Sequence, residues 1–158
     1  MKRLYMFILG VAVAAMCCTM SAQSIKQTFL SMPDTLCPFF SPQQRLQLLR
    51  LYDAQAPDSL VNLFGTKSKI TFLTEQQLTM SITNDVEYQL LQKADTTYFI
   101  QTVCAPICSS VVKAYIANWM YVGRVNAPFN DAVFPKAEIK DGELQWTDCT
   151  PTDNLGFK

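Results

Sequence analysis

Histidine is absent from this chain of 158 residues, and glycine occurs only five times. Without histidine the chain cannot build a Ser-His-Asp or Cys-His catalytic arrangement, nor a zinc or iron site with histidine ligands. The few glycines match neither a phosphate-binding loop nor a dinucleotide-binding fingerprint, since both motifs need several glycines at fixed spacing. We therefore assign no catalytic residue, no metal ligand and no cofactor from the sequence.

Strong charge of either sign is also lacking. The chain has 13 basic and 13 acidic residues, and no block of like charges occurs anywhere. A domain that binds nucleic acid shows a basic patch or stripe, because phosphate contacts dominate its affinity. The composition therefore excludes nucleic acid as a partner.

The long apolar run needed for a membrane span is missing, but a shorter one begins the chain. Lys2 and Arg3 precede an apolar stretch, residues 4–15, which is shorter than the ~20 residues that a bilayer requires. Small residues follow, and Ala22 is a suitable last residue before cleavage. This layout predicts a signal peptide over residues 1–22, and no stable membrane span after cleavage. The alternatives are a retained anchor and lipidation at Cys17 or Cys18.

The remaining chain, residues 23–158, has the length of a single domain with one core. Two helix starts open it. Ser24 followed by Gln27 is typical of an N-cap, and Pro33 ends that turn. The segment "SPQQ" gives a second N-cap at Ser41, followed by a leucine stripe that predicts a helix ending near Gln55.

After Gly65 the apolar period changes from helical to two, which is typical of strands. The separations between these strands are too short for parallel crossovers, so we predict an antiparallel meander of about five strands. The last two run over residues 97–104 and 111–121. Asp141-Gly142 predicts a two-residue hairpin turn that pairs Lys140 with Glu143 as an exposed ion pair. The predicted fold is α+β, with two N-terminal helices packed on an antiparallel meander and a C-terminal hairpin.

Four of the six cysteines lie after the predicted signal peptide: Cys37, Cys104, Cys108 and Cys149. An even number in an exported chain favours disulfides, with three connectivities open. Cys104 and Cys108 flank a predicted hairpin tip, where opposed Cα atoms come within disulfide reach. That bridge closes a short loop and contributes ~2 kcal/mol in the chain-entropy model. Cys37 with Cys149 is assigned by elimination, and its long loop would contribute ~5 kcal/mol.

A second interpretation makes Cys104 and Cys108 a working site. Copper(I) prefers thiolate ligands, and paired cysteines also carry thiol–disulfide exchange. Copper proteins with this spacing also use a histidine, and exchange sites commonly place CxxC at a helix N-terminus. Structural cysteines are therefore the primary prediction, and a thiol or copper(I) site is the alternative.

The aromatic residues near the end of the longest predicted strand allow a further alternative. Trp119 and Tyr121 lie there, and Phe129 and Phe134 follow in a loop. They could line a groove for a peptide or glycan, but residues at strand spacing more often pack the core. We predict core packing.

Three segments together resemble a known family: "SIKQTFLSMPDTLCPFFSPQQRLQLLRLYD", "FGTKSKITFLTEQQLTMSI" and "IQTVCAPICSS…YIANW". Their order is similar to that of the domain-of-unknown-function family 3256, small exported proteins of Gram-negative gut and oral bacteria. The resemblance spans about residues 23–121. It implies an exported α+β domain with no assigned activity, and it transfers no catalytic residue. The stretch after Gly123 departs from the family pattern.

These observations lead to one expectation about function. We expect a protein exported to the periplasm or cell surface of a Gram-negative bacterium, acting as a non-enzymatic binding or structural module of the envelope. Its partner would be another envelope protein, a peptide or a glycan. The alternative is a thiol–disulfide or copper(I)-binding protein that uses Cys104 and Cys108.

Overall fold

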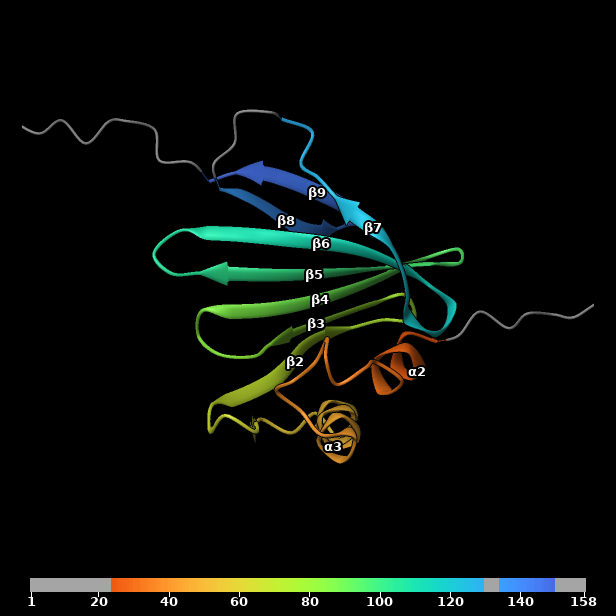
Figure 1. Ribbon diagram of the computed structural model, residues 1–158. Coiled ribbons are helices and arrows are strands. Elements are labelled where there is room, and N and C mark those ends of the chain that lie inside the picture. The colour runs from red at the N-terminus through yellow and green to blue at the C-terminus, as the bar shows by residue number, and fades with distance from the viewer. Residues whose placement is uncertain (1–23, 130–133, 150–158) are drawn as a thin grey trace, which may run out of the picture.

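The structure is a computed structural model that describes residues 24–129 and 134–149 (Figure 1). The predicted signal peptide, its cleavage point after Ala22, and Cys17 and Cys18 lie outside the described residues. The described chain has two α-helices, one 3-10 helix and nine strands: α2 (Ile25–Leu30), α3 (Pro42–Asp53), β1 (Leu60–Val61), β2 (Lys67–Leu73), β3 (Gln77–Ser81), β4 (Val86–Lys93), β5 (Thr96–Cys104), β6 (Cys108–Ile116), η1 (Ala117–Trp119), β7 (Met120–Val125), β8 (Pro135–Lys140) and β9 (Glu143–Asp148).

Strands β1 to β7 form one antiparallel sheet in which each strand pairs with its neighbours in sequence, and β8 and β9 form a separate two-stranded sheet. This arrangement confirms the predicted α+β class and the antiparallel pairing. The main sheet has seven strands, where the sequence predicts about five. No helix in the described residues is long and apolar enough to cross a membrane.

The two helices begin where their N-cap residues place them. Ser24 Oγ accepts a hydrogen bond from Gln27 N, at 3.4 Å. At α3, Ser41 N donates to Gln44 Oε1 at 3.0 Å and Gln44 N donates to Ser41 Oγ at 3.3 Å, with Pro42 at the first helical position. All three bonds satisfy amides that the helix itself leaves unpaired.

The helices and one face of the main sheet enclose the larger core. Phe29 of α2 and Leu48 of α3 are buried in it together with Leu78, Tyr88 and Phe99 from three neighbouring strands. Leu78 and Phe99 are both register partners of Leu90 on β4, and Tyr88 lies two residues from Leu90 on that strand, so these residues share one face of the sheet. We call this face the helix-side face.

The β8–β9 hairpin covers the other face, and Figure 1 shows it and the helices at opposite sides of strands β2 to β6. Ala137 is buried there with Ile100 and Val112. Ile139 N donates to Gln89 Oε1 at 3.0 Å, so the hairpin crosses over the sheet as far as β4.

The hairpin turn has the predicted geometry, but its ion pair is different. Asp141 and Gly142 have φ values of 52° and 73°, as a type I′ turn requires. Lys140 lies opposite Glu143 in register, yet Glu143 forms its ion pair with Lys93 of β4. Packing of the hairpin on the sheet brings Lys93 to Glu143, which local sequence cannot reveal.

The predicted single strand over residues 111–121 is wrong. The chain instead reverses at η1 between β6 and β7, where Asn118 and Trp119 have φ values of 57° and 60°. Asn adopts this left-handed region readily, whereas a bulky residue such as Trp does so rarely. The Trp119 ring lies 5.4 Å from that of Tyr115, and Nε1 donates to Ser31 Oγ at 3.3 Å. These contacts hold a turn that carries neither glycine nor proline as a signal.

Candidate functional site

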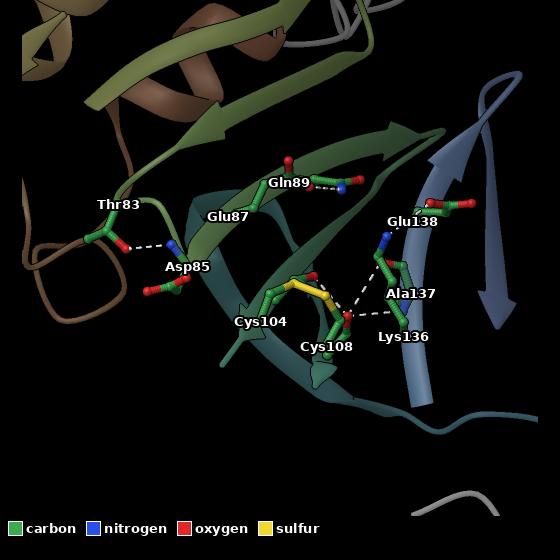
Figure 2. Close-up of a disulfide and its surroundings, with 11 residues drawn as sticks. Thr83, Asp85, Glu87, Gln89, Cys104, Cys108, Lys136, Ala137 and Glu138 are labelled. Atoms are coloured by element: carbon green, nitrogen blue, oxygen red, sulfur yellow. Dashed lines mark hydrogen bonds and ion pairs between the residues drawn. A yellow bond between two sulfur atoms is a disulfide. The ribbon is translucent and has the colours of Figure 1, made fainter. Parts of the chain in front are cut away.

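The predicted bridge between Cys104 and Cys108 is present at the end of the β5–β6 hairpin (Figure 2). The two residues are directly opposed in register, with an S–S bond of 2.05 Å and Cα atoms 3.8 Å apart. Both residues are half-buried, and the Ala105–Pro106 peptide bond between them is cis. The sequence pattern therefore identified a real pair.

Several hydrogen bonds surround the disulfide and hold the same end of the hairpin. Cys104 N donates to Asp85 O at 2.8 Å, which ties β5 to the turn before β4. Thr102 Oγ1 and Ser110 Oγ are 2.8 Å apart, and Ser110 Oγ accepts from Ala137 N at 2.9 Å. Figure 2 shows Ala137 facing this corner from β8. The disulfide and these hydrogen bonds together link the β5–β6 hairpin, the turn before β4, and strand β8.

A small cavity of about 150 Å³ lies beside the disulfide. Its lining includes Cys104, the acidic residues Asp85 and Glu87, and the basic residue Lys136. No group of three or more Cys, Asp or Glu side chains in the described residues is arranged to hold a metal ion. A disulfide exchanges with an external thiol only where that thiol can reach one of its sulfurs, so the accessibility of the half-buried Cys104 decides whether exchange can occur here.

The second predicted pair, Cys37 with Cys149, is wrong. Both cysteines are free. Cys37 is completely buried in the core between the helices and the sheet, whereas Cys149 directly follows β9 and donates its N–H to Phe134 O at 3.0 Å. The main sheet separates the two. The pair is predicted only because these two cysteines are left over. The sequence does not show that they lie on opposite faces of the main sheet, since that depends on which face each segment covers.

Burial also determines the chemistry of Cys37. It raises the pKa of this thiol from 9.0 to about 12, and the nearby Arg45 guanidinium opposes the effect only weakly. A thiol with such a pKa stays protonated at neutral pH, and the protonated form is neither a nucleophile nor a metal ligand. Cys37 is therefore a core residue.

We expect a thiol assay to distinguish these roles. Of the four cysteines after residue 22, Cys104 and Cys108 should not react in the native protein, and Cys37 should react only after unfolding. Replacing Cys104 and Cys108 by serine should lower the free energy of unfolding by only ~2 kcal/mol, because the closed loop is short. Ellman titration with and without urea, and urea unfolding of the double variant, measure both quantities.

The control for this assay is Cys149→Ser. In urea, this variant should show one reactive thiol fewer than the parent protein. Its free energy of unfolding should stay within ~0.5 kcal/mol of the parent value, as for other surface substitutions. Two reactive thiols in the native protein that disappear in the Cys104→Ser/Cys108→Ser variant would contradict a structural disulfide.

A larger hollow lies at the other edge of the main sheet, between the C-terminal end of α3 and strand β2. Its volume is about 560 Å³, and its apolar lining comes from Leu48, Leu51, Ala56, Pro57 and Ile70. The polar lining comes from Tyr52, Asp53, Gln55, Asp58, Lys69 and Thr71. We call this hollow the α3–β2 groove.

Some polar side chains of the α3–β2 groove already form an ion pair within the protein, and others do not. Both carboxylate oxygens of Asp53 accept from Lys26 Nζ, at 2.8 and 2.9 Å. The side chains of Asp58 and Lys69 are exposed and form no hydrogen bond or ion pair with any other described residue. The groove therefore presents one free carboxylate and one free ammonium group beside an apolar floor.

Sequence reasoning missed the α3–β2 groove because its lining comes from two segments that only the fold brings together. It also misjudged some aromatic positions. Trp119 packs against the larger core as predicted, but Tyr121, for which the sequence also predicts core packing, is 56% exposed. Tyr121 lies on β7, the last strand of the main sheet, and strand spacing alone does not show which part of the sheet the helices cover.

Comparison with known proteins gives a family and a fold. The family model described as "Protein of unknown function (DUF3256)" matches residues 17–138. A solved structure of a domain of an uncharacterized protein from Porphyromonas gingivalis W83 has a similar fold, with a TM-score of 0.60 and 14% sequence identity. The match covers 81% of this chain and 83% of that chain. No curated protein matches the chain.

Proposed function

The chain belongs to the DUF3256 family of proteins of unknown function, and from that premise we propose that it is an exported, non-enzymatic binding module of the bacterial envelope. The observation that supports this proposal is the α3–β2 groove. A hollow of about 560 Å³ has the size of small-ligand sites, which combine an apolar lining with a few convergent polar groups. The export part of the proposal rests on the N-terminal sequence pattern.

The groove lacks a pair of free acids. Hydrolysis of a glycoside commonly needs two carboxyl groups, one as acid and one as base or nucleophile. In the groove lining, Asp58 is free, but Asp53 accepts from Lys26 with both oxygens. This arrangement suits binding better than general acid–base catalysis.

The lining favours a hydroxyl-rich ligand such as an oligosaccharide. The Asp58 carboxylate accepts from hydroxyl groups, the Lys69 ammonium donates to them, and the Gln55 amide does both. Leu51 and Ile70 offer apolar surface to the C–H face of a sugar ring. The Asp53 carboxylate is already bound by Lys26. The affinity for the ligand should therefore depend on the side chains of Asp58 and Lys69.

The test is binding of neutral trisaccharides, with chitotriose, maltotriose and cellotriose as probes, measured by saturation-transfer NMR. We expect at least one probe to bind, and Asp58→Asn/Lys69→Gln to weaken it about tenfold, since two exposed polar contacts are lost. The probe should remain uncleaved after prolonged incubation. If export occurs as proposed, intact mass of the protein recovered from its host should show Gln23 as the first residue.

The matched control is Asp95→Asn/Lys140→Gln, which makes the same chemical changes at two exposed positions away from the groove, one in the β4–β5 turn and one at the end of β8. It should leave binding unchanged. The proposal is wrong if none of the three probes binds, if the two double variants bind alike, or if the probe is hydrolysed.

A second function has one observation in its favour. Cys104 lines the cavity of about 150 Å³, so thiol–disulfide exchange or copper(I) binding at Cys104 and Cys108 is the alternative. It predicts that a thioredoxin-type reductant opens the bridge in the native protein, giving the two reactive thiols that the assay above would detect.

A further inference from the structure

Two basic side chains lie directly opposite each other on the main sheet. Lys113 of β6 and Arg124 of β7 are register partners, and Lys113 is also the partner of Phe99 on β5. Partners in register point to the same side of a sheet. Both basic groups therefore project from the helix-side face, at the opposite end of the strand order from the α3–β2 groove.

No acidic residue of the chain segment around this pair offsets the two charges. Residues 96–130 contain no Asp or Glu, and Lys113 and Arg124 are the only charged residues among them. The ion pairs of the described residues all lie elsewhere, at Lys26, Arg45, Lys93 and Lys136. Within the described residues, Lys113 and Arg124 have neither an ion pair nor a side-chain hydrogen bond.

Like charges opposed across two strands destabilise a sheet. The usual compensation, a carboxylate on the third strand, is absent because Phe99 occupies that position. Basic side chains hold a carboxylate through charge-assisted hydrogen bonds, which are stronger than neutral ones. The arrangement costs stability in the free protein and becomes favourable when an anion lies between the two groups.

The surroundings of the pair are apolar. Tyr121 lies on the same helix-side face of β7, is 56% exposed, and its ring is 5.7 Å from that of Tyr115. Val122, the bulged residue next to it, is 60% exposed. Val103, near the end of β5 on the same face, is 48% exposed. Large apolar side chains gathered beside two unpaired cations are typical of a surface that docks another protein.

We propose that this part of the helix-side face, centred on Lys113, Arg124 and Tyr121, binds an acidic peptide segment of a partner protein. The two cations complement its carboxylates, and the exposed Tyr121 and Val122 side chains contact its apolar residues. The apolar neighbours favour a peptide over an acidic glycan, whose surface is covered by hydroxyl groups. The two positive charges favour an acidic partner, and they also speed its association by attracting it toward this face.

The peptide is expected to cross the sheet face, and not to add an eighth strand along β7. The pairing of β6 with β7 shifts between Ala114 and Tyr115, which leaves Val122 as an extra, bulged residue. Bulges at a sheet edge interrupt the row of backbone groups that a further strand needs. Side chains therefore carry the recognition.

The test uses a fluorescein-labelled peptide with the sequence Val-Glu-Val-Asp-Val-Glu, capped at both ends, and fluorescence anisotropy with the purified protein. We expect binding at low salt that weakens as sodium chloride is added. Lys113→Gln/Arg124→Gln should weaken binding roughly tenfold, since one half-buried and one exposed charge contact are lost. The unfolding temperature of this double variant should equal or exceed that of the parent protein, because the like-charge repulsion is gone.

Two controls make the result specific. Lys67→Gln/Lys140→Gln removes the same net charge from exposed positions of β2 and β8, and it should bind the peptide as the parent does. The neutral peptide Val-Gln-Val-Asn-Val-Gln should bind at least about tenfold more weakly. The proposal is overturned if the acidic peptide does not bind, if the two double variants bind alike, or if tetragalacturonate binds more tightly than the acidic peptide.

Discussion

Replacing Arg45 by alanine is expected to lower the free energy of unfolding by ~3 kcal/mol or more. Arg45 lies in the second turn of α3, and its side chain is only 2% exposed. Its Nη1 donates to Met32 O, and its Nη2 lies 2.7 Å from Asp34 Oδ1. The substitution removes the buried stem and leaves a cavity, and it takes the donor from a buried carbonyl.

Urea unfolding measures this effect, and two further variants separate its causes. Arg45→Met keeps most of the packing but not the hydrogen bonds, so it should lose ~1–3 kcal/mol. Arg50→Ala changes an exposed arginine of the same helix and should stay within ~0.5 kcal/mol of the parent. A loss for Arg45→Ala no larger than that for Arg50→Ala would contradict the assigned role.

Replacing Asn62 by alanine is the second substitution with a large expected effect, again ~3 kcal/mol of unfolding free energy. Asn62 is 4% exposed, and its side chain takes part in five hydrogen bonds. Nδ2 donates to Thr66 Oγ1 at 2.6 Å, to Ser68 Oγ at 3.0 Å and to Ile82 O at 3.3 Å. Alanine takes a donor away from the buried Ser68 hydroxyl and from Thr66, while Ile82 O still accepts from Ser68 Oγ at 2.6 Å. A buried polar group that loses its partner costs more than the average worth of a hydrogen bond.

The backbone near Asn62 should respond as well. Asn62 Oδ1 accepts from Phe64 N at 2.9 Å and from Thr66 N at 3.2 Å, so it shapes the turn before β2. Amide hydrogen exchange at residues 64 and 66 should therefore become faster in Asn62→Ala. The control is Asn84→Ala in an exposed turn, for which neither stability nor exchange at these amides should change. Unaltered protection in Asn62→Ala would show that the turn is held by other contacts.

These two networks explain why the segments that resemble the family occur in this chain. The "MPD" segment supplies Met32 O and Asp34 to Arg45, and the "LYD" segment supplies Asp53 to Lys26. The "GTKS" segment supplies Thr66 and Ser68 to Asn62. The first two segments join α2 and the chain that follows it to α3, and the third shapes the turn before β2, so all three have structural roles in this chain.

Local patterns were sufficient where a few neighbouring residues determine the conformation. Helix starts at Ser24 and Ser41 follow from side chains that cap free amides, and the turn at Asp141-Gly142 follows from residues that tolerate positive φ. The Cys104–Cys108 bridge belongs to this group, because both sulfurs lie on one hairpin. No such signal marks η1, where Trp119 adopts positive φ and is held by contacts with Tyr115 and Ser31.

The amino-acid sequence by itself thus determined the α+β class, the antiparallel pairing and the short disulfide, since all three depend on residues close together along the chain. Only the tertiary structure decided which face of the sheet each segment covers. That choice separates Cys37 from Cys149, exposes Tyr121, brings Asp58 to Lys69, and sets Lys113 opposite Arg124 with no carboxylate partner. The physical reason is that packing between layers joins residues far apart in sequence, and no local periodicity records those contacts.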